Sequence, residues 1–192
     1  MTLINKFLLP LLLGATLSLP TYSVASEIQR ATVEHVGKRY LVELEILIDA
    51  DRDQVYQLLT DFENLAQLNK NILESYKIYS LSDSQHRTFV RTEGCVTFFC
   101  QEVTLVEDIE ELPGGVIINT AVPEKSTVTF AHTRWKVTAV GKRTRLEYNT
   151  DLKPNFWIPP LIGPPLIEKA LRNEALTIAA NLEKLATASA DD

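Results

Sequence analysis

Apolar and polar side chains alternate along residues 39–48, and a two-residue period of this kind predicts a β-strand. Asp49 and Asp51 follow as helix-capping residues, and the apolar positions behind them recur at helical spacing. Those positions are Val55, Leu58, Leu59 and Phe62, and Leu65, Leu68 and Ile72 continue the spacing. The pattern therefore predicts one strand followed by two short helices.

Residues 75–152 return to strand character and are rich in β-branched and aromatic side chains. Turn signals divide this stretch into about six strands, expected at 75–81, 89–92, 103–109, 116–122, 128–140 and 144–152. Consecutive strands joined by short turns pair in antiparallel fashion. In the last strand Leu146 and Tyr148 share one face while Arg145 and Glu147 share the other, so one face of the sheet is covered and the other is exposed to solvent.

A proline-punctuated apolar loop occupies residues 154–163, and apolar side chains then recur every three or four residues. This predicts an amphipathic helix over 165–188, about 36 Å long at 1.5 Å per residue. The helix is the largest apolar stripe available to cover the sheet. We therefore expect an α+β helix-grip fold, in which a curved antiparallel sheet of about six to seven strands wraps around the long C-terminal helix. Such a grip can enclose a cavity.

The first 25 residues have the arrangement of a signal peptide. Lys6 precedes an apolar run of about 13 residues, and the small residues Ser23 and Ala25 follow it. A membrane anchor is the alternative, but a span needs about 20 apolar residues. We expect cleavage near Ala25 and a periplasmic or secreted protein with a lead-in at 26–38, one domain at 39–188 and a polar tail at 189–192.

Composition and charge exclude several function classes. A chain of 192 residues allows one domain, and its formal net charge of −6 without a basic block argues against nucleic-acid binding. Two cysteines and three scattered histidines provide no metal-ligand cluster, so we expect no metal and no cofactor. Glycine-rich phosphate loops and nucleophile motifs are absent from the sequence, so no catalytic residue is predicted.

Cys95 and Cys100 are close enough in the sequence to form a disulfide in an oxidising compartment. On one straight strand they would point to opposite faces, so a disulfide requires a turn between them. Two buried thiols are the alternative.

We interpret Glu107, Asp108, Glu110 and Glu111 as a solvated strand end rather than a cation site. His132 and Arg134 point to solvent if Trp135 points inward, because neighbouring strand positions alternate between faces.

The order of elements resembles the START-like helix-grip superfamily, also called SRPBCC, which includes polyketide cyclases and coenzyme-Q-binding proteins. Three stretches carry the likeness: residues 55–65, Trp135 with the hairpin at 141–148, and residues 152–160. The resemblance spans about residues 40–186. It implies a hydrophobic cavity for lipids, isoprenoid quinones, sterols or polyketides, in proteins that act as carriers, sensors or enzymes.

Candidate ligand-binding residues are apolar or aromatic and follow the last strands, the loop and the helix. They are Trp135, Tyr148, Phe156, Trp157, Ile158, Ile162, Ile167, Leu171 and Ile178. Residues 156–162 could form a cavity mouth that also touches a membrane, or simply plug the core. Trp135 and Tyr148 are expected to point inward, where an ordinary core position is the alternative to ligand contact.

The sequence thus predicts an exported binding protein for an apolar small molecule, of the lipid or isoprenoid quinone class, held between sheet and helix. Two alternatives remain. One is a cyclase or dehydratase of the same fold, which needs an inward-facing acid or base. The other is an envelope interaction module whose interior is filled by its own side chains.

Overall fold

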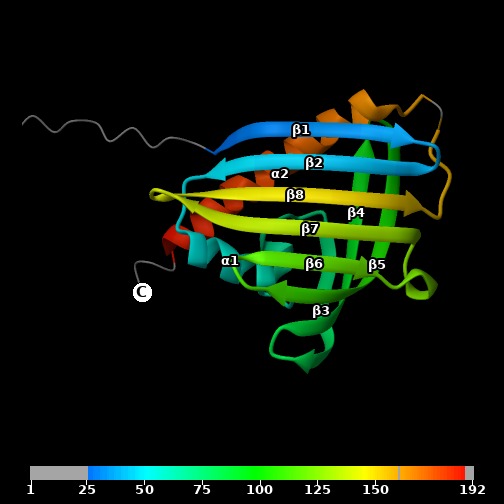
Figure 1. The fold of residues 1–192 in the computed structure, drawn as a ribbon. Coiled ribbons are helices and arrows are strands. Elements are labelled where there is room, and N and C mark those ends of the chain that lie inside the picture. The colour runs from blue at the N-terminus through cyan, green and yellow to red at the C-terminus, as the bar shows by residue number, and fades with distance from the viewer. Residues whose placement is uncertain (1–25, 160, 189–192) are drawn as a thin grey trace, which may run out of the picture.

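A single antiparallel sheet of eight strands curves around one long helix, as Figure 1 shows for the computed structural model. The structure describes residues 26–159 and 161–188, so the predicted signal peptide and polar tail lie outside the described residues. The strand order is β1-β2-β8-β7-β6-β5-β4-β3. The predicted α+β helix-grip fold is confirmed, with eight strands where six to seven were expected.

Apart from β1, the elements follow the predicted order along the chain. They are β1 (Glu27–Val36), β2 (Arg39–Ile48), α1 (Arg52–Thr60), the 3₁₀ turn η1 (Leu65–Gln67), β3 (Ile72–Ser82), β4 (Gln85–Val96), β5 (Phe99–Leu112), β6 (Val116–Ala121), the 3₁₀ turn η2 (Pro123–Lys125), β7 (Val128–Val140), β8 (Arg143–Pro154) and α2 (Pro164–Ala188).

Strand β1 is the element that the sequence pattern did not predict. It pairs with β2 at one edge of the sheet and buries only Ala31 and Val33. A bulge between Ile28 and Arg30 interrupts its two-residue period, which hides the alternation in the sequence. The predicted lead-in at residues 26–38 thus contains an edge strand of the sheet.

The second predicted helix is shorter than expected. It is the three-residue turn η1, and Ile72 already belongs to β3. By contrast, α1 begins where its capping signal predicts, because the Asp51 side chain accepts hydrogen bonds from the backbone N–H groups of Asp53 and Gln54.

The core lies between α2 and the half of the sheet formed by β1, β2, β8 and β7. Its most deeply buried members are Ile46, Ile48, Val55, Val137, Ala179 and Leu182. In Figure 1, α2 runs diagonally behind this half of the sheet. The core-facing side of α2 includes the buried alanines Ala175, Ala179 and Ala186.

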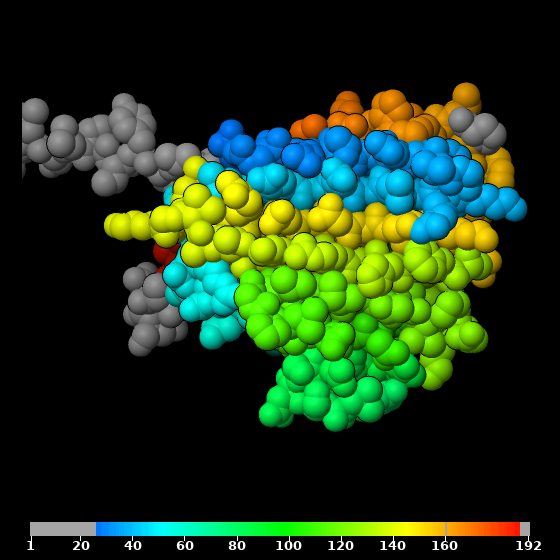
Figure 2. Space-filling model, viewed as in Figure 1, coloured from blue at the N-terminus to red at the C-terminus, as the bar shows by residue number. Residues whose placement is uncertain are grey.

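The opposite face of the same strands is polar. Figure 2 shows this face, where side chains of β1, β2, β8 and β7 lie in parallel rows. Ion pairs connect neighbouring strands, with Arg145 Nε 3.0 Å from Glu45 Oε1 and Arg30 Nη1 3.4 Å from Glu43 Oε2. The predicted division into a covered face and a solvent-exposed face therefore holds for these four strands.

Candidate functional site

The interior is hollow where β3, β4 and β5 separate from α2. An inner cavity of about 220 Å³ lies next to the core, and an outer cavity of about 440 Å³ lies towards the first turns of α2. A side cavity of about 140 Å³ adjoins both. Ile72 and Ile178 line the inner and outer cavities, and Leu105 lines the inner and side cavities. These shared walls make the three spaces neighbouring compartments of one interior.

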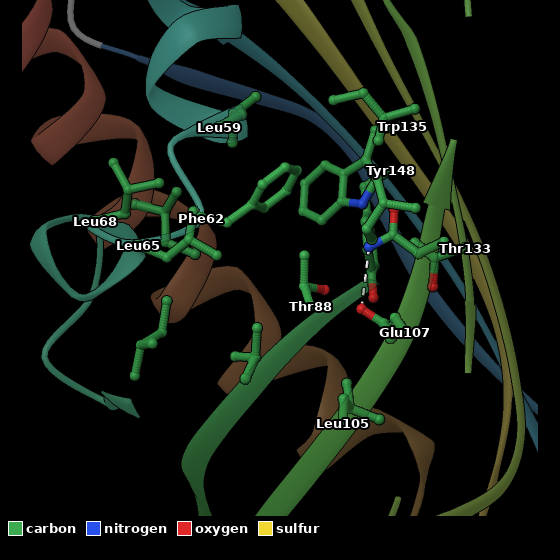
Figure 3. A pocket seen from close by; sticks show the side chains of 16 residues that line it. Leu59, Phe62, Leu65, Leu68, Thr88, Leu105, Glu107, Thr133, Trp135 and Tyr148 are labelled. Atoms are coloured by element: carbon green, nitrogen blue, oxygen red, sulfur yellow. Dashed lines mark hydrogen bonds between the residues drawn. The ribbon is translucent and has the colours of Figure 1, made fainter. Parts of the chain in front are cut away.

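The inner cavity has two apolar walls. Leu59, Phe62, Leu65 and Leu68 come from α1 and the segment after it, and Val90, Leu105, Ile109, Ile117 and Trp135 come from the sheet. Figure 3 shows these two groups facing each other, with Phe62 beside Trp135. Trp135 also packs against Tyr148 with ring centroids 4.4 Å apart. Both aromatic residues predicted to point inward therefore line this cavity.

Glu107 projects into this apolar interior, and its interpretation as part of a solvated strand end was wrong. Its side chain is only 7% exposed, because β5 continues to Leu112 and places Glu107 in mid-strand. Leu105 and Ile109 flank it on the inward face, as the two-residue period requires. In the sequence, Glu107 occupies a position of the two-residue strand period that Leu105 and Ile109 share. The acidic residues around it obscured this signal.

Two adjacent carboxyl groups on β5 have opposite electrostatic surroundings. Burial raises the pKa of Glu107, and the hydrogen bond that Asn119 Nδ2 donates to its Oε2, 3.1 Å away, only partly opposes that effect. Asp108 faces the other side, where Arg87 binds it through contacts of 2.7 and 2.6 Å and lowers its pKa. The interior carboxyl therefore keeps its proton to a higher pH than its neighbour does.

Further polar groups surround Glu107 on the sheet. The hydroxyl groups of Thr133 and Thr150 lie 2.7 Å apart. Burial raises the pKa of Tyr148 to about 12, with the charge of Glu107 adding to the effect and hydrogen bonds to the two threonines opposing it. The Tyr148 phenol is thus neutral at physiological pH. We call Glu107, Asn119, Thr133, Tyr148 and Thr150 the polar cluster.

The outer cavity is bounded by the first half of α2, the loop before it and the end of the β4–β5 hairpin. Six predicted ligand-binding residues line it: Phe156, Ile158, Ile162, Ile167, Leu171 and Ile178. Trp157 does not line it, because its side chain is 70% exposed and points away. At one wall, Asn71 Nδ2 donates a hydrogen bond of 2.8 Å to Glu174 Oε1 and connects the start of β3 to α2.

Cys95 and Cys100 are joined by a disulfide at the end of the β4–β5 hairpin. They are directly paired across the two strands, with their Cα atoms 4.1 Å apart. The required turn consists of Thr97, which has a left-handed φ of 55°, and Phe98, which is 78% exposed. The disulfide closes the hairpin where Cys95 lines the outer cavity.

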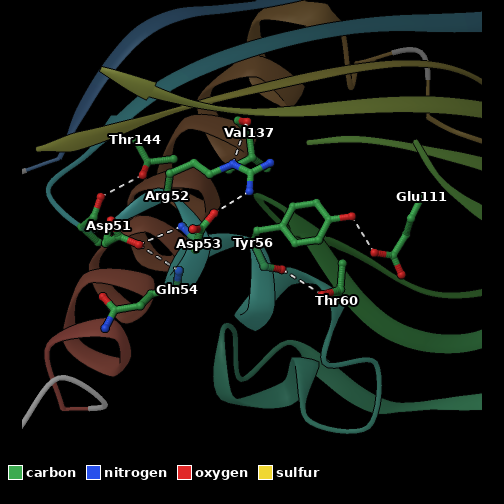
Figure 4. A network of polar contacts seen from close by, with 10 residues as sticks. Asp51, Arg52, Asp53, Gln54, Tyr56, Thr60, Glu111, Val137 and Thr144 are labelled. Carbon is green, nitrogen blue, oxygen red and sulfur yellow. Dashed lines mark hydrogen bonds and ion pairs between the residues drawn. The ribbon is translucent and has the colours of Figure 1, made fainter. Parts of the chain in front are cut away.

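A second polar network lies away from the cavities and holds α1 against the sheet (Figure 4). Tyr56 donates a hydrogen bond of 2.5 Å to Glu111 Oε2, and burial followed by this contact raises the pKa of the Tyr56 phenol. Buried His86 lies 3.2 Å from the other oxygen of Glu111. Within residues 26–159 and 161–188, no group of three histidine, cysteine or acidic side chains is placed to hold a metal ion.

Comparisons with known proteins agree with this architecture. The family described as "Polyketide cyclase / dehydrase and lipid transport" matches residues 39–190. No curated protein sequence matches the chain. None of the described helices has the length and apolar character needed to cross a membrane.

Solved structures share the fold at low sequence identity. A START superfamily protein from Mycobacterium smegmatis is 18% identical with a TM-score of 0.58, covering 77% of this chain and 97% of its own. The Zhui aromatase/cyclase from Streptomyces sp. R1128 is 15% identical with a TM-score of 0.60, covering 78% and 94%. A STAR-related lipid transfer protein from Xanthomonas axonopodis is 13% identical with a TM-score of 0.57, covering 79% and 98%.

Proposed function

The chain belongs to the polyketide cyclase/dehydrase and lipid transport family, and from this premise we propose that it binds an apolar small molecule of the lipid or isoprenoid quinone class. The observation that carries the proposal is the interior between α2 and the sheet. Its outer cavity of about 440 Å³ falls within the range of roughly 300–1,000 Å³ that is usual for ligand pockets. Binding rests on burial, at about 25 cal/mol per Å² of apolar surface removed from water.

We also propose that the protein acts outside the cytoplasm, after removal of residues 1–25. The signal-peptide pattern supports this location, and so does the disulfide between Cys95 and Cys100, since disulfides persist in oxidising compartments. A membrane in that compartment would supply the ligand.

Contact with that membrane is proposed through the rim of the outer cavity. Trp157 and Leu161 are 70% and 79% exposed, and their neighbours Phe156, Ile158 and Ile162 line the cavity. Phe98 adds an exposed aromatic ring on the hairpin that borders the same cavity. Large exposed apolar side chains beside a cavity opening suit a membrane interface.

A specific observation favours a second candidate, a cyclase or dehydratase. Such an enzyme needs an acid or base inside the cavity, and Glu107 is an inward-facing carboxyl group. An interaction module with a filled interior is less well supported, because the cavities are open space.

Native mass spectrometry of the protein taken from its exported compartment, followed by organic extraction, tests the proposal. We expect one apolar molecule per protein, released unchanged. Recovery of a chemically altered molecule after incubation with the extracted compound would favour the enzyme. A protein that takes up no apolar compound from a total lipid extract would contradict the binding function.

A further inference from the structure

We propose that the polar cluster recognises the uncharged, oxygen-bearing end of an otherwise apolar ligand, a carbonyl or a hydroxyl group, and selects against ligands that end in a carboxylate. This inference rests on the proposed function, since it concerns a ligand held in the same interior. It assigns Glu107 as the main specificity-determining residue, with Asn119 and Tyr148 beside it.

The sheet brings the cluster together from four neighbouring strands. Asn119 on β6 is paired with Thr133 on β7, and Thr133 is paired with Thr150 on β8. Glu107 on β5 lies diagonally opposite Asn119, close enough for their hydrogen bond. A row of polar side chains therefore crosses a wall that is otherwise apolar. Figure 3 shows Glu107, Thr133 and Tyr148 grouped on this wall.

The cluster retains hydrogen-bonding capacity that its own members do not use. Asn119 Nδ2 donates to Glu107 Oε2, while Asn119 Oδ1 is buried and has no hydrogen-bond partner among the described residues. Glu107 has a second oxygen and, when protonated, a donor. Since buried polar groups in proteins are nearly always satisfied, this unused capacity indicates a polar ligand group.

The charges around the cluster set the kind of ligand. Glu107 and Tyr148 are the titratable residues among those that line the inner and side cavities, and neither cavity is lined by lysine or arginine. A carboxylate placed there would meet no cation and would face a carboxyl group. A carbonyl oxygen can instead accept from protonated Glu107 or from the Tyr148 hydroxyl, and a ligand hydroxyl can donate to Asn119 Oδ1.

The sizes of the compartments fix the direction of the ligand. The cluster borders the inner and side cavities, which are small, and the outer cavity is the largest and opens between α2 and the hairpin. The oxygen-bearing head therefore lies at Glu107, and an apolar tail extends past Ile72 and Ile178 towards the rim.

The experiment compares three probes of equal chain length: hexadecan-1-ol, hexadecanoic acid and hexadecane. Their binding is measured by displacement of the uncharged fluorophore N-phenyl-1-naphthylamine. For the wild-type protein we expect hexadecan-1-ol to bind about tenfold more tightly than the other two, as one hydrogen bond to a buried partner would give. Tight binding of the acid, equal to that of the alcohol, would overturn the inference.

Variants then locate the preference. Glu107→Leu should lose the preference for the alcohol and keep its affinity for hexadecane. Glu107→Gln can still form a hydrogen bond and should retain most of the preference for the alcohol. Asp108→Asn is the matched control, because Asp108 is the neighbouring carboxyl group on the other face of β5 and lines none of the three cavities, so its change should leave the preference intact. An unchanged preference in Glu107→Leu would overturn the assignment.

Failure of the binding function and failure of head-group recognition would give different results. If none of the three probes displaces the fluorophore, or the fluorophore itself does not bind, the proposed function fails together with this inference. If all three bind with equal affinity, the binding function stands and only the recognition by the polar cluster is overturned. Thermal unfolding of each variant establishes that it is folded before binding is measured.

Discussion

The two halves of α2 meet the sheet in different ways. In the second half, Ala179, Leu182 and Ala186 are fully buried against the core. In the first half, Ile167 and Leu171 are partly buried and border the outer cavity instead. One continuous helix therefore closes the interior at one end and leaves it open at the other. Stability and binding are thus separated along the helix, so substitutions in the two halves should have different consequences.

The largest expected effect is the loss of a buried leucine from the closed half. Leu182→Ala should lower the free energy of unfolding by about 2–5 kcal/mol, because it leaves a cavity in a close-packed core. Leu171→Ala should lower it by less than about 1 kcal/mol, since this side chain already borders open space. Urea unfolding measures both, and equal losses would contradict the division of the helix.

A smaller effect is expected from enlarging an alanine in each half. Ala179→Leu should destabilise the protein by about 1–3 kcal/mol, because Ala179 is fully buried in the core. Ala170→Leu adds the same atoms where Ala170 lines the outer cavity, so it should leave stability nearly unchanged and weaken binding of an apolar fluorophore. The account would be wrong if Ala170→Leu bound the fluorophore as the wild type does.

At the rim of the outer cavity, two adjacent residues are expected to make different contacts: Trp157 with a membrane and Phe156 with the ligand. Trp157→Ala should weaken binding to phosphatidylcholine vesicles about tenfold, because an exposed indole ring is lost from the interface. Phe156→Ala should mainly weaken ligand binding, since Phe156 lines the outer cavity. Vesicle sedimentation and fluorophore titration distinguish the two effects.

Leu81 provides the control for the rim. It is also exposed, but it lies by the β3–β4 turn, at the other end of β4 from the hairpin that carries Phe98. Leu81→Ala should therefore leave vesicle binding unchanged. A loss as large as that of Trp157→Ala would mean that exposure alone, and not the rim, determines membrane binding.

A still smaller effect is expected in the pH dependence of stability, which should differ between the neighbouring residues Glu107 and Asp108 on β5. Because burial raises the pKa of Glu107, its contribution to stability is complete below the ordinary glutamate pKa and is lost as pH rises through the raised value. Because Arg87 lowers the pKa of Asp108, that contribution is complete above the ordinary aspartate pKa and is lost as pH falls through the lowered value.

Urea midpoints measured across pH separate the two groups. Glu107→Gln should remove the loss of stability that accompanies a rise in pH above the ordinary glutamate pKa, and Asp108→Asn should remove the loss that accompanies a fall in pH below the ordinary aspartate pKa. A Glu107→Gln variant that loses stability with rising pH as the wild type does would show that the interior carboxyl does not titrate as its burial requires.

Long periodic segments were predictable from the sequence, and interrupted ones were not. The helix expected over 165–188 is Pro164–Ala188, and the strand expected over 39–48 is Arg39–Ile48, because each repeats its period many times. Strand β1 was missed since a bulge breaks its period near Ile28.

The same reasoning explains the candidate site. Residues on regular elements, such as Trp135, Tyr148 and Leu171, line the cavities as their periods indicate. In the loop before α2 there is no period, so the sequence could not separate inward Phe156 from outward Trp157. Glu107 was missed because local acidity suggested solvent, whereas its position in the strand period pointed inward.

We propose that an apolar ligand lies between the sheet and the open half of α2. A crystal structure of the protein loaded with the compound extracted from it tests this proposal. We expect one ligand spanning the outer and inner cavities, with its tail beside Leu171 and its oxygen-bearing end at Glu107. A ligand bound outside these cavities, or an interior closed by repacked side chains, would contradict it.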